Sequence, residues 1–162
     1  MGLLHRLDRL IAGVIAAAQW LALPLILLLF LQWPLRDLVQ CCSRQANDLG
    51  QIIFALLVAV SVTAATRAGT HLAADTFAQH YSPRTRHRLR QICAIVALLP
   101  WSLFVIFASK SFVLSSVLGL EAFADTGNPG YYIIKGALWL MAILIIAQVV
   151  IEIVRSPPAD DT

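Results

Sequence analysis

Long apolar runs separated by short polar clusters constrain the fold of this chain more than any other feature. Four such runs occupy residues 10–31, 49–65, 92–120 and 131–154. About 20 consecutive apolar residues in a helix match the roughly 30 Å hydrocarbon core of a bilayer. A segment in lipid must also satisfy its backbone hydrogen bonds internally. The runs therefore predict four transmembrane α-helices.

The composition agrees with a lipid-embedded chain. Of the 162 residues, 59% are hydrophobic and 13% are charged, whereas soluble domains carry roughly 25% charged residues. We therefore expect an all-α integral membrane protein with one four-helix domain over residues 1–162. The expected helices lie near residues 10–32, 47–67, 83–116 and 131–154, followed by a polar tail at 156–162.

The first run is too long for a cleavable signal peptide, whose apolar region has about 7 to 15 residues. It continues through residues 25–30 without a polar side chain, so we expect it to be retained as the first membrane helix. Pro24 lies within this run and is expected to kink the helix, because proline has no N–H group and clashes with the preceding turn.

The distribution of basic residues predicts the orientation. The loop between the second and third runs is rich in arginine, whereas the segment from Ser111 to Ile134 has no Lys or Arg and contains Glu121 and Asp125. Cytoplasmic loops carry the excess of Lys and Arg, so both termini are expected in the cytoplasm. The arginines of the second loop are Arg67, Arg84, Arg86, Arg88 and Arg90.

The sequence offers no catalytic, cofactor-binding or metal-binding residues. Cys41 and Cys42 are adjacent, while Cys93 is expected on the other side of the membrane, so a thiol relay would lack its second pair. The histidines all lie outside the apolar runs, where they cannot serve as axial haem ligands inside a bundle. The basic loop also lacks the interleaved aromatics of a nucleic-acid site. We expect neither an enzyme nor a nucleic-acid partner.

The same residues bear on two other functions. A four-helix membrane thiol or quinone redox protein is the alternative from another class, and the missing second cysteine pair argues against it. A self-sufficient small transporter is a third option. Ion coupling usually requires acidic residues at mid-membrane depth, whereas Asp48 and Glu152 lie at the ends of the expected helices.

The second helix and the loop after it carry a spaced set of polar residues. Asp48 precedes the second run, and Arg67, Gly69, His71 and Asp75 follow one another at its other end. Gly69 permits the left-handed backbone that often ends a helix. The spacing of His71 and Asp75 would let them pair on a short amphipathic helix in the cytoplasmic loop.

A helix start is expected after this loop. Ser82 can act as N-cap and Pro83 suits the first helical position, so the third helix is expected to begin before the membrane. Arg86 follows in its first turn.

This pattern resembles the small membrane subunit, the DctQ type, of tripartite ATP-independent periplasmic (TRAP) transporters. In that family an acidic residue begins the second helix, and an Arg-x-Gly-x-His-hydrophobic-x-x-Asp stretch follows at its inner end, with a Pro and basic residues before the third helix. Asp48 replaces the more usual Glu, and Lys135 stands near a common Pro. The residues that match the family pattern are Asp48, Arg67, Gly69, His71, Leu72, Asp75, Pro83 and Arg86.

The resemblance implies a division of labour in a bacterial inner membrane. A large DctM-type membrane subunit would hold the substrate and sodium sites, a periplasmic binding protein would deliver an organic acid, and this chain would brace the large subunit. The substrate itself is not encoded in any recognisable feature of this chain.

Lys110 is the remaining charge within an apolar run. It lies 18 residues beyond Ile92, which places it about 27 Å along the third helix and near the depth of Asp48. We expect Lys110 either to form an interface ion pair with Asp48 or to extend its amine to the outer interface.

Overall fold

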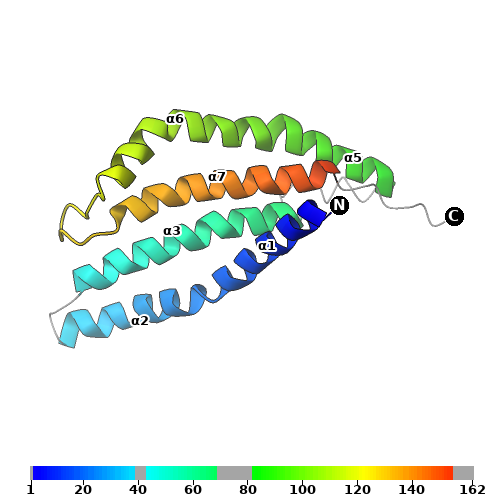
Figure 1. Cartoon of the computed structure of the whole chain (residues 1–162). Coiled ribbons are helices and arrows are strands. Elements are labelled where there is room, and N and C mark those ends of the chain that lie inside the picture. Colours follow the sequence, from blue (N-terminus) through cyan, green and yellow to red (C-terminus); the bar gives the residue numbers. More distant parts are fainter. Residues whose placement is uncertain (1, 39–42, 69–81, 155–162) are drawn as a thin grey trace.

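The computed structural model describes residues 2–38, 43–68 and 82–154. Gly69, His71, Leu72 and Asp75 lie outside these residues, as do Cys41 and Cys42. The described chain is helical apart from the connection at residues 119–130 and short turns (Figure 1). The elements are α1 (Gly2–Gln19), α2 (Ala22–Leu38), α3 (Ser43–Ala68), α5 (Pro83–Cys93), π-helix η1 (Ala94–Leu98), α6 (Leu99–Leu118) and α7 (Tyr131–Val154).

Within the described residues, four stretches are long and apolar enough to cross a membrane, which confirms the expected number of spans. They cover Leu4–Gln32, Arg44–Ala68, His87–Leu118 and Tyr131–Val154. At one end, called the loop end, residues 119–130 connect α6 to α7. At the opposite end, called the terminal end, lie the first turn of α1, α5 and the last turn of α7 (Figure 1).

The first span is a broken helix. Trp20 and Leu21 form a turn between α1 and α2, and their N–H groups donate to the carbonyls of Ala17 and Ala18, three residues back. Pro24 explains the break, because it has no N–H to donate to the carbonyl of Trp20 and its ring crowds the preceding turn. The proline expected to kink the span thus lies just after the point where α1 ends.

The third span is one continuous helical path with a π-helical turn inside it. The backbone N–H of Leu99 donates to the carbonyl of Ala94, five residues back, instead of the four of an α-helix. From His87 to Leu118 the 32 residues reach about 48 Å. This exceeds the roughly 30 Å hydrocarbon core, so the span must tilt or extend beyond the lipid.

The helices are packed in the order α6, α7, α3 and then α1 with α2 (Figure 1). α7 and α3 form the centre of this row, since α7 packs on both α3 and α6, and α3 packs on α1 and α2. α7 therefore lies between α3 and α6. The buried side chains at these contacts include Thr63, Ser102, Val113, Ile145 and Val149.

Small polar groups help the helices approach one another. The indole N–H of Trp139 on α7 donates to Ser109 Oγ on α6 at 3.0 Å. The hydroxyls of Ser102 and Ser109 each donate to the main-chain carbonyl four residues earlier in the same helix. These hydroxyls therefore have hydrogen-bond acceptors without water. Many large apolar side chains point outward, as lipid-facing surfaces require.

Candidate functional site

Asp48 lies in the first turns of α3 and is 7% exposed. Its Oδ2 accepts hydrogen bonds from Thr126 Oγ1 at 2.6 Å and from Asn128 Nδ2 at 2.9 Å. Both donors belong to the connection between α6 and α7. A buried carboxylate must be hydrogen-bonded to be tolerated, and here the connection supplies both bonds. Asp48 therefore ties the connection to α3.

The backbone of the connection is fixed by its own contacts, which hold these two donors in place. An isolated bridge pairs Ala122 with Pro129, and the N–H of Phe123 donates to the carbonyl of Asn128 at 2.8 Å. Gly130 adopts a φ of +129°, and a Cβ there would lie 2.9 Å from Ile52 Cδ1 on α3. Glycine is thus required both by the backbone conformation and by the close approach to α3.

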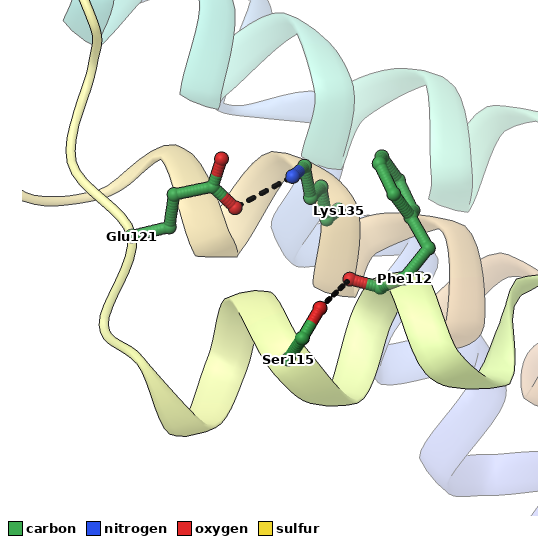
Figure 2. Close-up of polar contacts among 4 residues, drawn as sticks. All are labelled: Phe112, Ser115, Glu121 and Lys135. Carbon is green, nitrogen blue, oxygen red and sulfur yellow. Dashed lines mark hydrogen bonds and ion pairs between the residues drawn. The ribbon is translucent and has the colours of Figure 1, made fainter.

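Lys135 forms a second polar cluster at the loop end. Its Nζ donates to Glu121 Oε2 (Figure 2). The same Nζ lies 4.0 Å from the centre of the Phe112 ring and 5.1 Å from that of the Tyr131 ring. The side chain of Lys135 is 12% exposed. The ion pair and the two aromatic faces compensate for the loss of hydration. The cluster joins α6, the connection and α7.

The Lys135 ammonium also changes the acidity of its partner. Its hydrogen bond to Glu121 lowers the pKa of that carboxyl below the ordinary value of 4.5. Glu121 belongs to the connection rather than to a membrane-spanning segment. It therefore remains ionised over the physiological pH range.

Two contacts tie helices together at the terminal end. Arg67 on α3 places Nη1 3.0 Å from Asp8 Oδ1 and donates to the main-chain carbonyl of Asp8 at 3.3 Å, which joins α3 to α1. Gln91 on α5 donates from Nε2 to the carbonyls of Glu152 and Ile153 at 3.2 and 3.1 Å. The last carbonyls of a helix have no donors within it, so Gln91 caps the end of α7.

The sequence motif is only partly within the described chain. Asp48 and Arg67 lie at opposite ends of α3, and Pro83 and Arg86 lie in the first turn of α5. The expected N-cap is confirmed, since the N–H of Thr85 donates to Ser82 Oγ at 3.3 Å. Gly69, His71 and Asp75 lie outside the described residues, as already noted, so their roles stay predictions.

Lys110 and Asp48 are not brought together. Lys110 is exposed on α6, and α7 separates that helix from α3. The Asp48 carboxylate is bonded instead to Thr126 and Asn128. The expected interface ion pair between Lys110 and Asp48 is therefore absent between these two described residues, because α7 lies between their helices.

The sequence did not reveal the contacts of four residues that hold the loop end together. Thr126 and Asn128 bind Asp48, while Glu121 and Lys135 pair with each other. The turn-forming run from Thr126 to Gly130 was a usable signal, because Thr and Asn beside glycines often turn polar groups back onto nearby structure.

A protein-family model described as "Tripartite ATP-independent periplasmic transporters, DctQ component" matches residues 25–157. The matched range contains 133 of the 162 residues. Searches of the curated proteins and of the solved structures gave no match. Together with four apolar helices, the family match makes the chain a multi-pass membrane protein and a transporter component rather than an enzyme. The chain belongs to the DctQ family of tripartite ATP-independent periplasmic transporters.

Proposed function

We propose that this chain is the small permease subunit of a sodium-coupled TRAP transporter for an organic acid, and that it braces the large membrane subunit. The observation that supports the bracing role is that buried and half-buried polar side chains link the helices to one another. Asp48, Lys135 and Arg67 each join separate helices or a helix and the connection. Such contacts stabilise the relative positions of the helices, which suits a static scaffold.

The proposed partners are a large DctM-type membrane subunit and a periplasmic substrate-binding protein. Family membership supports this, since the chain is one component of a tripartite system. Apolar surface for the large subunit is available on residues 25–30 of α2 and 104–107 of α6, where several large side chains are exposed.

The proposed location is the bacterial inner membrane, with both termini in the cytoplasm and the loop end in the periplasm. The charges support this orientation, because α5 at the terminal end carries four arginines while the connection at the loop end carries Glu121 and Asp125. The family match does not favour the alternative of a thiol or quinone redox protein.

Reconstitution tests the proposal. Liposomes would receive this chain alone, the co-encoded large subunit alone, or both, each with the periplasmic binding protein, an organic-acid ligand of that protein and an inward sodium gradient. We expect uptake only with both membrane subunits. Uptake by this chain alone would contradict the bracing role, and full uptake by the large subunit alone would make this chain dispensable. Collapse of the sodium gradient is the control for coupling.

A further inference from the structure

The chain contains two lysines, and their surroundings in the structure differ. Lys135 on α7 is enclosed by Glu121 and two aromatic rings, as described above. Lys110 on α6 is exposed. Within the parts of the chain that the structure describes, no hydrogen bond or ion pair to Lys110 is found. One lysine thus has its counter-charge in the chain, while the other has none within the described residues.

The depth of Lys110 follows from its neighbour. Ser109 is bonded to Trp139, which is eight residues beyond Tyr131, the first residue of α7. Lys110 therefore lies about 12 Å along the helix axis from the start of α7, roughly a third of its length. An ionised side chain at such a depth normally faces a bundle interior and pairs with another charged group.

The acidic side chains of this chain that lie nearest to Lys110 along the membrane normal already have other partners. Asp48 is bonded to the connection and separated from α6 by α7, and Glu121 is paired with Lys135. The amine of Lys110 instead shares the open surface of α6 with Phe104 and Phe107, which are 68% and 72% exposed. Lipid chains offer no anion to this position.

We propose that Lys110 marks the contact between α6 and a transmembrane helix of the large membrane subunit, and that this helix supplies a carboxylate to the Lys110 amine. Charge complementarity selects the occupant, since a cation inside the membrane is stabilised most by an anion in direct contact. Phe104 and Phe107 would pack against the same helix. The inference rests on the proposed function, in which this chain works joined to a large membrane subunit.

Coupling with a hydrophobic carbodiimide tests this directly. A protonated carboxyl adds to dicyclohexylcarbodiimide to give an O-acylisourea. A neighbouring neutral amine then attacks its acyl carbon, which forms an amide and releases dicyclohexylurea. In the purified complex of both membrane subunits, we expect Lys110 to be linked to an Asp or Glu of the large subunit. Lys135 and Glu121 form an internal positive control within this chain. Lys110→Met should remove the first link and retain the second.

Formation of the control link without any link from Lys110 to the large subunit would overturn the proposal. A link from Lys110 to a second copy of this chain would also overturn it. So would recovery of Lys110 unmodified and in contact with phospholipid, detected by a photoactivatable headgroup, because the amine would then be reaching the interface.

Co-purification gives a second readout. Lys110→Met should lower the amount of large subunit recovered with this chain several-fold, whereas Lys110→Arg should largely preserve it. Arg44→Met, which removes another exposed cation at the start of α3, is the matched control and should have no effect. The melting temperature of Lys110→Met purified alone should not fall, which separates lost association from failed folding.

The two proposals fail in different ways. If the wild-type chain does not co-purify with the large subunit, both the proposed function and the proposed contact of Lys110 are contradicted. If the wild-type complex forms and Lys110→Met leaves both its yield and its stability unchanged, only the role of Lys110 is contradicted.

Discussion

The Oδ2 atom of Asp48 lies 2.6 Å from the hydroxyl of Thr126, although the two residues are 78 positions apart in the chain. Asn128 donates to the same oxygen. One buried carboxylate therefore holds the connection between α6 and α7 against the start of α3. Its removal leaves two donors without their acceptor.

Asp48→Ala should lower the free energy of unfolding by about 1–3 kcal/mol, because a buried hydrogen-bond network loses its charged acceptor. Asp48→Asn should cost less, since one carbonyl oxygen remains. Thermal unfolding in detergent measures both. Asp125→Ala is the control, because Asp125 is exposed in the same connection, and an equal loss in that variant would contradict a specific role for Asp48.

Gly130→Ala should be destabilising by about 1–3 kcal/mol, because the backbone is at positive φ and the new Cβ would meet Ile52. Gly136→Ala is the matched control within α7, where a Cβ would meet nothing within 4 Å. That change should be neutral or stabilising by up to about 1 kcal/mol. The melting temperature should therefore fall in Gly130→Ala and should stay the same or rise in Gly136→Ala, each compared with wild type.

Glu121→Gln should make the stability of the loop end less dependent on pH. Lys135 holds the pKa of Glu121 below 4.5, so the folded state binds this proton less tightly than the unfolded chain. The stabilisation is fully present above the unfolded pKa and is lost as the pH falls through the folded pKa. The gap in melting temperature between wild type and Glu121→Gln should narrow below pH 4.5. A constant gap from pH 7 downwards would show that the ion pair does not cause it.

Asp8 and Arg67 should show a small coupling energy. Their side chains are 29% and 26% exposed, and ion pairs in such settings contribute about 0.2–1 kcal/mol. A double-mutant cycle with Asp8→Ala and Arg67→Ala measures the carboxylate contact alone. Arg67→Ala should cost more than Asp8→Ala, because it also removes the bond to the main-chain carbonyl of residue 8.

The proposed orientation can be read by thiol labelling in intact cells. In a chain with Cys41, Cys42 and Cys93 replaced by serine, Asp125→Cys should react with an impermeant maleimide, whereas Arg88→Cys should react only after permeabilisation. Both positions are exposed, one at each end of the molecule. Labelling of Arg88→Cys alone in intact cells would reverse the assigned topology.

Hydropathy was sufficient to predict the four spans, because burial in lipid requires long apolar helices whatever their neighbours. It could not predict the lateral order of those helices, and so could not show that α7 separates Lys110 from Asp48. The order depends on side-chain packing between α7 and its neighbours, which leaves no periodic signal in the chain.

Local backbone signals had mixed success. The predicted N-cap at Ser82 is confirmed, and so is the predicted disruption of the first span near Pro24. The π-helical turn at Ala94–Leu98 is not predicted from the sequence, although Pro100 just beyond it has no N–H to donate to the carbonyl of Val96 and so disturbs the α-helical pattern there.

That turn has a consequence for insertions and deletions. A π-helical turn accommodates one more residue than an α-helical turn, and one residue corresponds to about 100° around a helix axis. Inserting one residue into a regular α-helix would therefore rotate the two flanking parts against each other by that angle, whereas the π-helical turn takes up its extra residue within one turn and keeps α5 and α6 nearly in phase. Deleting one of the five residues would let the turn become α-helical with α5 facing almost as it does now, and Gln91 would still reach the last carbonyls of α7, which it caps. A one-residue deletion here should therefore be tolerated better than the same deletion within α6, where every turn is α-helical.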